Sequence, residues 1–197
     1  MRLLEEATAA LDEEGFDQFN VQRVLDRAGV SRATMYRHFE DVDGLIEAAL
    51  GEVYRREVDR YSAISIELIA SATDPAQFRR LLRTMLDGFS AISPTVRLQR
   101  AHTIALAATR PRLATAIALV QEAVTDRWTS VVVEGQRRGF LRADLDPRAA
   151  AVVIQALTIG RIVDDAGTTH LGNDRWAEVL FETFDRTFLT PGDRVRS

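Results

Sequence analysis

The chain has 197 residues, 46% hydrophobic and 27% charged, with a formal net charge of −4, which is the composition of an ordinary globular protein. Cys is absent, so disulfides, thiolate chemistry and Cys-based metal sites are excluded. No apolar run approaches the roughly 18 to 20 residues that cross a bilayer, and no export signal opens the sequence, so we expect a cytoplasmic protein without a membrane partner.

The first predicted helix covers 2–14, with apolar residues on one face. A short helix follows over 21–28, because Val21, Val24, Leu25 and Ala28 recur at helical spacing. Gly29 then supplies a left-handed position at which a helix can stop and turn. Ser31 is a good N-cap for a second short helix over about 32–38.

That second helix is polar, and few of its side chains help to build a core. Two short helices joined by a tight turn are typical of a helix-turn-helix, whose second helix enters the DNA major groove. We expect Arg32 and Arg37 to reach guanine or phosphate. The other predicted DNA contacts are Thr34, Tyr36 and His38 to phosphate, Ala33 to a thymine methyl, and Ser31 and Gln22 beside them. Alternatively, the Tyr36 ring packs inside the motif and only its hydroxyl reaches out.

The segment resembles the TetR family of bacterial transcription regulators. The resemblance rests on the AGVS run at 28–31, the YRHF run at 36–39 and the Gly15-Phe16 pair, and it covers about the first fifty residues. It implies a DNA-binding domain over 1–46, with the motif at about 20–39, and a domain over 47–197 for dimerisation and effector binding. The implied partners are a palindromic double-stranded DNA operator, a second copy of the chain and a small-molecule effector of unknown identity.

The charge distribution partly opposes this interpretation. Residues 1–50 carry five Arg against eleven Asp and Glu, a net charge of −6, whereas a DNA-binding domain is expected to be basic. Locally the balance reverses, because 20–39 holds four Arg against one Asp. Family members commonly have a phosphate-contacting Lys close to Asp43, and this chain has none.

Acidic residues around Asp43 begin the next predicted helix, which suits the positive end of a helix dipole and continues towards Ala70. Prolines then open four more helices, over roughly 75–92, 94–108, 111–138 and 147–166. Gly139 ends the third of these. A last helix covers about 174–189. No segment alternates with period two, so the predicted fold is all-α with about nine helices.

The helix over 147–166 is apolar nearly all the way round over 149–159, more than one small domain usually covers. We predict that it and the last helix form a two-fold dimer interface. The predicted interface residues are Val152, Val153, Ala156, Gly160, Trp176, Leu180 and Phe184. Alternatively, the two helices close the core of a single chain.

Enzyme motifs are scarce: no GxSxG, Walker loop, GxGxxG or HExxH occurs, so neither catalysis, a metal nor a cofactor is expected. The middle helices offer residues for a mostly apolar ligand pocket with a few polar groups. The candidates are Tyr61, Met85, Phe89, His102, Leu106, Trp128, Gln155 and Asp165. Asp165 has another interpretation, a pair with Arg161 four residues earlier on the helix.

The predicted function is that of a DNA-binding transcriptional regulator, a homodimeric repressor released from its operator by a small molecule. Two alternatives come from other classes. One is a helical ligand-binding or protein-interaction module whose acidic flanks have weakened or abolished DNA binding. The other is an all-α enzyme that turns over the molecule in the pocket.

Overall fold

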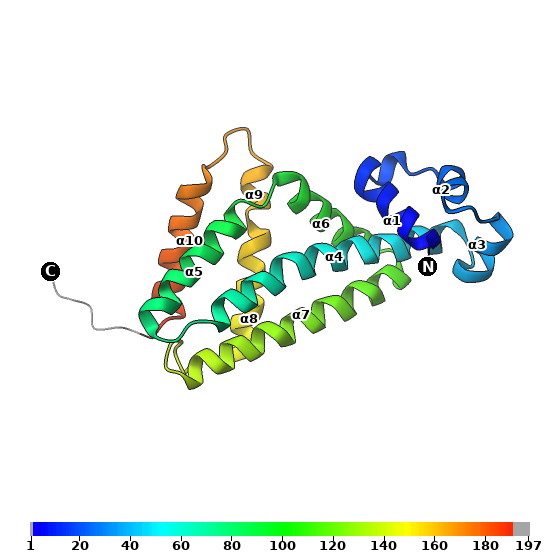
Figure 1. Ribbon diagram of the computed structural model, residues 1–197. Coiled ribbons are helices and arrows are strands. Elements are labelled where there is room, and N and C mark those ends of the chain that lie inside the picture. The colour runs from blue at the N-terminus through cyan, green and yellow to red at the C-terminus, as the bar shows by residue number, and fades with distance from the viewer. Residues whose placement is uncertain (1, 191–197) are drawn as a thin grey trace. The chain divides into compact units, whose positions relative to one another are not determined.

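The computed structural model describes residues 2–190, apart from the side chains of Asp17 and Thr158. The helices are α1 Arg2–Glu14, η1 Phe16–Gln18, α2 Val21–Ala28, α3 Arg32–Phe39, α4 Val42–Ala70, α5 Pro75–Ser90, α6 Pro94–Ala107, α7 Pro111–Arg137, α8 Pro147–Gly160, α9 Ile162–Asp165 and α10 Asn173–Thr187 (Figure 1). The all-α prediction is confirmed. Within the described range there is one α-helix more than the nine or so predicted, because the helix expected over 147–166 is divided. None of these helices combines the length and apolar character that crossing a bilayer requires.

The predicted proline starts are confirmed, since α5, α6, α7 and α8 each begin at a proline. The Asp74 carboxylate accepts a hydrogen bond from the Gln77 amide at 2.8 Å, and Asp146 accepts one from the Ala149 amide at 2.7 Å. Proline lacks the N–H that would go unpaired at a helix start, so an acidic N-cap before proline fixes where the helix begins.

The division between α8 and α9 falls at Arg161, which the apolar pattern did not predict. The Arg161 side chain is buried and turns towards other elements. Its Nη1 donates to the Ser90 carbonyl oxygen at 2.6 Å, and its Nη2 donates to the Leu171 carbonyl oxygen at 2.8 Å. Both partners are distant in sequence or lie in a loop, so the local pattern carries no sign of the break.

Unit 1, one of two compact units, comprises the chain up to Asp59 together with Arg100–Gln121. In it α1 packs against α2, and most apolar side chains of the first helices are buried. The core side chains include Leu3, Ala7, Leu11, Val24, Leu25, Ala28, Met35, Leu45, Ala49 and Leu113. Both helices of the predicted motif therefore contribute side chains to the core of unit 1.

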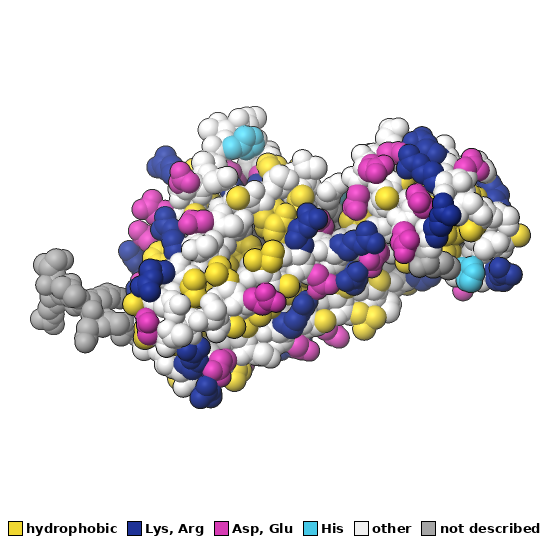
Figure 2. Space-filling model, in the orientation of Figure 1, with side chains coloured by type: hydrophobic (Ala, Val, Ile, Leu, Met, Phe, Trp, Pro, Cys, Tyr) yellow, Lys and Arg dark blue, Asp and Glu magenta, His cyan; other side chains and the backbone are white. Residues whose placement is uncertain are grey.

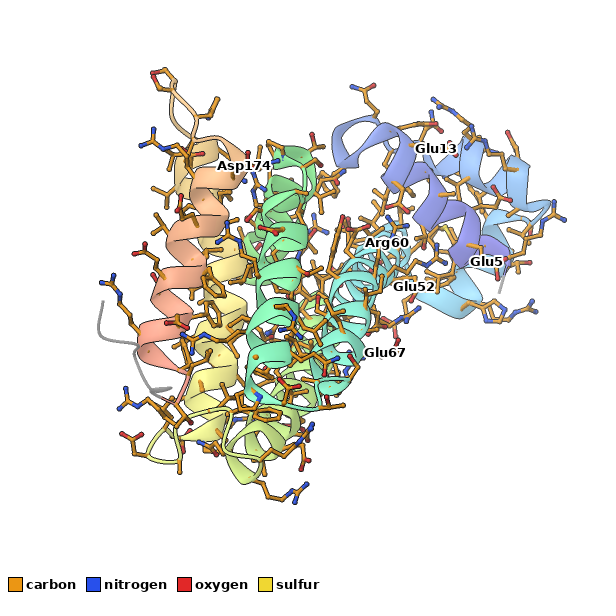
Figure 3. All side chains as sticks on the ribbon, turned by 60° about the vertical axis from the view of Figure 1, so that its left-hand side comes forward. Glu5, Glu13, Glu52, Arg60, Glu67 and Asp174 are labelled. Carbon is orange, nitrogen blue, oxygen red and sulfur yellow. The ribbon has the colours of Figure 1, made fainter. Side chains whose placement is uncertain are left out.

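Unit 2 comprises Arg60–Gln99 and the chain from Glu122 onwards. Here α5 and α10 lie side by side, as Figures 1 and 3 show. The core side chains include Phe78, Leu82, Met85, Leu86, Trp128, Val132, Ile154, Leu180, Phe184 and Phe188. A single antiparallel bridge between Leu141 and Leu189 ties the chain after α7 to the chain after α10.

Candidate functional site

The turn between α2 and α3 is built as the sequence predicted. Gly29 adopts the left-handed conformation with φ of 67°, and its amide donates to the Asp26 carbonyl oxygen at 3.2 Å. The Ser31 hydroxyl accepts a hydrogen bond from the Thr34 amide at 3.2 Å, which caps α3. Since one end of α2 and the start of α3 are both fixed, α3 has a defined direction.

The outward face of α3 carries the predicted DNA-contacting side chains. Met35 is fully buried and anchors the helix. Thr34 and Phe39 are half-buried, and the side chains at the other positions are exposed, with Tyr36 46% exposed. The exposed set is Ser31, Arg32, Ala33, Tyr36, Arg37 and His38. The structure thus brings these residues to one surface, and the alternative of a Tyr36 ring packed inside the motif is wrong.

Gln22 lies beside this surface, because it contacts Arg32 from α2. The Arg32 Nε donates to the Gln22 amide oxygen at 3.3 Å. The Gln22 amide nitrogen donates in turn to Asp26 at 3.0 Å. This chain of hydrogen bonds orients the Arg32 guanidinium while leaving its two terminal nitrogens available.

The other two cations of the motif are used within unit 1. Arg23 forms an ion pair with Glu14 at 2.6 Å, and Arg27 lies 3.7 Å from both Glu13 and Glu14. Within residues 2–190, Arg37 has no carboxylate within ion-pair distance. The arginines of α2 are therefore neutralised by the acidic end of α1. The net positive charge of residues 20–39 lies on α3. Figure 2 shows the mixture of basic and acidic side chains elsewhere on the visible face.

The acidic residues after α3 are matched by an arginine that sequence reasoning missed. Arg112, near the start of α7, donates from Nε to Glu47 at 2.9 Å, from Nη1 to Glu40 at 3.1 Å and from Nη2 to Asp41 at 3.1 Å. Arg110 lies 3.6 Å from Glu47. A signal was present, because cations in the first turn of a helix oppose its dipole and call for an acidic partner.

The turn between α3 and α4 is tight. The Asp41 carboxylate accepts a hydrogen bond from the Gly44 amide at 2.5 Å. A Cβ on Gly44 would lie 2.1 Å from the Phe39 carbonyl oxygen, so this position excludes every other residue. The start of α4 is consequently held against the end of α3.

The eight predicted pocket residues do not share one cavity. Tyr61, Met85 and Phe89 line a cavity of about 350 Å³ between α4 and α5, and Trp128 and Met85 line a small one of about 30 Å³.

The other predicted pocket residues lie elsewhere. His102 and Leu106 belong to unit 1, where the His102 ring meets Phe16 edge-on with centroids 6.1 Å apart. In unit 2, Gln155 donates to the Thr125 hydroxyl at 3.0 Å.

Asp165 lines a polar cavity of about 270 Å³ and pairs with Arg97, not with Arg161. The Arg97 Nε and Nη2 donate to the two Asp165 oxygens at 2.5 and 2.6 Å, and both side chains are at most 4% exposed. These hydrogen bonds hold the pKa of Asp165 below its ordinary value. The expected Arg161–Asp165 pair is therefore wrong, because Arg161 is directed to Ser90 and Leu171.

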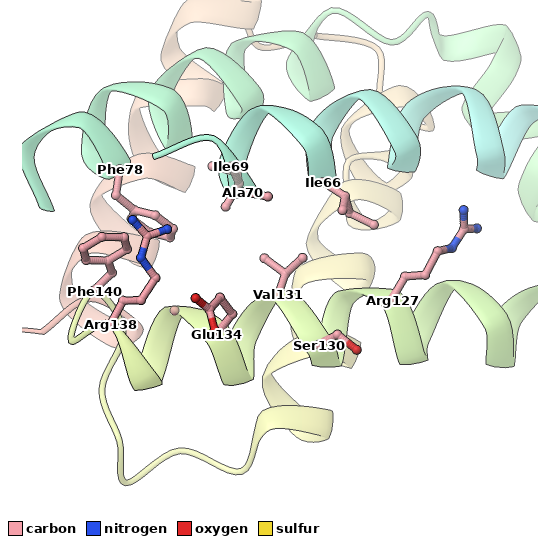
Figure 4. A pocket seen from close by; sticks show the side chains of 11 residues that line it. Ile66, Ile69, Ala70, Phe78, Arg127, Ser130, Val131, Glu134, Arg138 and Phe140 are labelled. Carbon is pink, nitrogen blue, oxygen red and sulfur yellow. The ribbon is translucent and has the colours of Figure 1, made fainter. Parts of the chain in front are cut away.

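A second cavity of about 350 Å³, between α4 and α7, contains none of the predicted residues (Figure 4). It is lined by Ile66, Ile69, Ala70, Phe78, Arg127, Ser130, Val131, Glu134, Gly135, Arg138 and Phe140. These residues come from three helices and the segment after α7, and no periodic pattern links them. Only their packing in unit 2 assembles the site.

The predicted dimer residues fall into two groups. On α8, Val152 and Val153 are 50% and 43% exposed, and Ala156 and Gly160 are exposed as well. Trp176 on α10 is half-buried.

Leu180 and Phe184, by contrast, are only 4% and 3% exposed within the chain itself. Their assignment to a surface is wrong, since the α10 stripe that carries them packs in the unit 2 core. Val179 of α10 is instead 61% exposed, and Val163 of α9 is 80% exposed.

Comparison with known proteins identifies the N-terminal region. Residues 3–49 match the family model described as bacterial regulatory proteins, tetR family. The first fifty residues are therefore similar to the N-terminal DNA-binding domain of that family, and a helical region follows them.

The chain is also similar to the HTH-type transcriptional regulator BetI of Burkholderia lata, 27% identical over 97 residues. That match covers 49% of this chain and 48% of the relative, so it spans about half the length of each.

Two solved structures share the fold over nearly the whole chain. A regulator assigned to the TetR family from Mesorhizobium loti has a TM-score of 0.68 at 21% identity, covering 96% of each chain. A transcriptional regulator from Saccharomonospora viridis, solved in complex with choline, has a TM-score of 0.67 at 16% identity, covering 96% of this chain and 97% of that one.

Proposed function

We propose that the protein is a homodimeric repressor that binds a palindromic operator through α3 and is released by a small molecule. The observation that carries the DNA contact is the state of the arginines in the motif. Arg23 and Arg27 are paired with acidic residues of α1, whereas Arg37 is exposed and has no carboxylate partner in the described chain. An exposed, unpaired guanidinium on a capped helix is well suited to phosphate or guanine.

Each predicted DNA-contacting residue of α3 and its N-cap has a proposed role. Arg37 and Arg32 reach a guanine edge or a phosphate, and the hydrogen bond from Arg32 to Gln22 favours one orientation of its guanidinium. Thr34, Tyr36 and His38 contact phosphate, Ala33 contacts a thymine methyl, and Ser31 caps the helix and lies next to the backbone.

Exposed aliphatic side chains of α8, α9 and α10 support the dimer. Val152, Val153, Val163 and Val179 are each at least 43% exposed, and the small residues Ala156 and Gly160 lie among them on α8. Apolar patches of this kind mark interaction surfaces. A two-fold pairing would place two copies of α3 about 34 to 36 Å apart, in successive major grooves.

Effector control is proposed to act through α4 and α7. In unit 2 the two helices line the cavity of Figure 4. In unit 1 the same two helices are tied by the hydrogen bond from Arg112 to Glu47. A molecule that wedges α4 from α7 would strain this tie next to α3. Ligand and operator would then weaken each other's binding by the same factor.

A role on chromosomal DNA places the protein in the cytoplasm. The test is a mobility-shift titration with the DNA upstream of its own gene, using Arg37→Ala and, as a matched control, Arg23→Ala. Retarded complexes that need Arg37 and not Arg23 support the proposal. A folded protein that retards no upstream DNA would instead favour an interaction module.

The dimer is tested separately by sedimentation. A species of twice the 22.0 kDa chain mass is expected at micromolar concentration, and Val152→Glu should convert it to the single chain. Thr183→Glu, on an exposed and already polar position of α10, is the control. A wild-type protein that sediments only as a single chain contradicts the dimer.

A further inference from the structure

The cavity between α4 and α7 in unit 2 has an apolar floor and a charged edge. Ile66, Ile69, Phe78, Val131 and Phe140 supply the apolar surface, and the volume of about 350 Å³ is at the low end for a small-molecule site. Figure 4 shows the aliphatic side chains facing each other across the space, with Arg138 beside the two phenylalanines. A ligand that fills this cavity must be small, largely apolar and able to interact with the charged side chains at its edge.

Arg138 determines the charge of that edge. It lines the cavity and, within residues 2–190, has no carboxylate within ion-pair distance. Its neighbour Arg137 takes the one acidic side chain of the cavity, donating to the two oxygens of Glu134 at 2.6 and 2.7 Å. These hydrogen bonds lower the pKa of Glu134, which keeps its negative charge and directs it to Arg137. Arg127 is engaged within the chain, so the positive charge left for a ligand is that of Arg138.

The aromatic part of the cavity is already occupied by a cation. The Arg138 guanidinium carbon lies 4.5 Å from the centre of the Phe140 ring, and the Phe78 and Phe140 rings are 5.3 Å apart. Quaternary ammonium ligands are recognised by open aromatic faces. Here the chain's own guanidinium covers such a face. A second cation would find no open aromatic face and would be repelled by the positive charge of Arg138.

We infer that this cavity binds a small amphipathic carboxylate, with its acid group on Arg138 and its apolar part against Ile66, Ile69 and Val131. A guanidinium that lies over a ring still has N–H groups to donate, and a carboxylate accepts two parallel hydrogen bonds from a guanidinium edge. Closing the acid group onto Arg138 gives this guanidinium a carboxylate within ion-pair distance, while the apolar chain covers the aliphatic floor. The idea that this carboxylate is the effector rests on the proposed repressor function. The idea that it binds in this cavity does not.

The binding test uses octanoate as the probe, with 1-octanol as the uncharged analogue and choline as the cation, measured by calorimetry on the full chain. Octanoate should bind, 1-octanol should bind at least about tenfold more weakly, and choline should not bind, because a hydrogen-bonded charge is lost in each analogue. Octanoate no better than 1-octanol, or a preference for choline, overturns the inference.

Variants locate the site. Arg138→Gln should weaken octanoate binding about tenfold or more and leave 1-octanol unchanged, whereas Arg138→Lys, which keeps the charge but loses the planar fork, should bind octanoate with an intermediate affinity. Arg186→Gln, an exposed arginine of α10 paired with Glu182, is the matched control and should bind as wild type. If Arg138→Gln fails to fold, Ala70→Trp decides, since Ala70 is an exposed residue of the lining and a large side chain there should abolish both ligands. Unchanged octanoate binding in Ala70→Trp overturns the site.

Operator binding is measured on the same samples to separate this inference from the proposed function. If octanoate binding depends on Arg138 but the protein has no affinity for the operator, the proposed ligand site is supported and the repressor function is contradicted. Operator binding together with no octanoate binding does the reverse.

Discussion

Arginine is the only basic residue type besides histidine in this chain, and α3 and the core of unit 2 use it in opposite ways. In unit 1, α3 exposes Arg37 with no carboxylate partner in the described chain. In unit 2, Arg97 and Arg161 are 3% and 5% exposed and satisfy backbone and carboxylate oxygens. We therefore propose that the same type of side chain binds an external anion where the chain supplies no partner, and that it holds helices together where the chain does.

The buried pair gives the largest expected effect. Arg97→Ala leaves the Asp165 charge buried without its partner and should reduce the free energy of unfolding by about 3 to 5 kcal/mol. The control is Arg148→Ala, which removes an exposed pair with Asp126 and should cost at most about 1 kcal/mol. Urea denaturation measures both. Equal losses would show that burial does not distinguish the two kinds of arginine.

The same pair predicts a pH dependence. Because Arg97 lowers the pKa of Asp165 in the folded state, the pair stabilises the protein above the unfolded-state pKa and loses this contribution as the pH falls through the folded-state pKa. Asp165→Asn should therefore be less stable than wild type at pH 7, with the difference shrinking below about pH 4. Urea titrations of both proteins from pH 7 to pH 3 check this, and a constant difference would contradict it.

The exposed arginine predicts the next effect, on DNA binding. Arg37→Ala should weaken operator binding by about 1 to 3 kcal/mol if the guanidinium reads a guanine, and at one base position only. If it contacts phosphate, all sequences should lose affinity and the salt dependence should fall. Fluorescence anisotropy with point-mutated operators separates these results. The free energy of unfolding should not change, since no protein contact is lost.

How far the sequence could predict these features depends on how many residues separate a side chain from its hydrogen-bond or ion-pair partner along the chain. Gly29, Ser31 and the exposed face of α3 were predictable because their partners lie within a few residues. The partner of Asp165 is 68 residues away, and that of Arg112 is 65 residues away, so local spacing could not identify either. For the same reason the pattern suggested Arg161 for Asp165.

The helices of unit 2 illustrate the same limit. The apolar stripe of α10 was visible in the sequence, but which side it faces depends on where α5 packs. Leu180 and Phe184 therefore looked like surface candidates while they belong to the core. The cavity between α4 and α7 was not predictable at all, because only tertiary packing brings residues such as Ile66 and Arg138 to the same cavity.

The helix cap should have a smaller effect. Ser31→Ala removes the hydrogen bond to the Thr34 amide and should destabilise α3 by about 1 kcal/mol without changing its charge. Operator affinity should fall in parallel, while the number of phosphate contacts stays the same. Measuring the salt dependence of Ser31→Ala beside Arg37→Ala tests this. A Ser31→Ala protein with a reduced salt slope would show that the hydroxyl itself acts in place of a charge.

The acidic turn after α3 gives the smallest effect. Arg112→Gln releases Glu40 and Asp41 from their partner, so operator affinity should fall by less than in Arg37→Ala. Adding Glu40→Gln should restore part of the loss, because that carboxylate is 84% exposed. Arg55→Gln, which releases Glu52 and Asp59 on α4, is the control and should leave affinity unchanged.

Hydroxyl-radical footprinting of the operator tests the central claim most directly, that two copies of α3 occupy successive major grooves. The account predicts two protected patches about 10 to 10.5 base pairs apart on one face of the duplex, related by the operator's two-fold symmetry, and both fading in Arg37→Ala. A single patch, or protection that is identical in wild type and in folded Arg37→Ala, would contradict it.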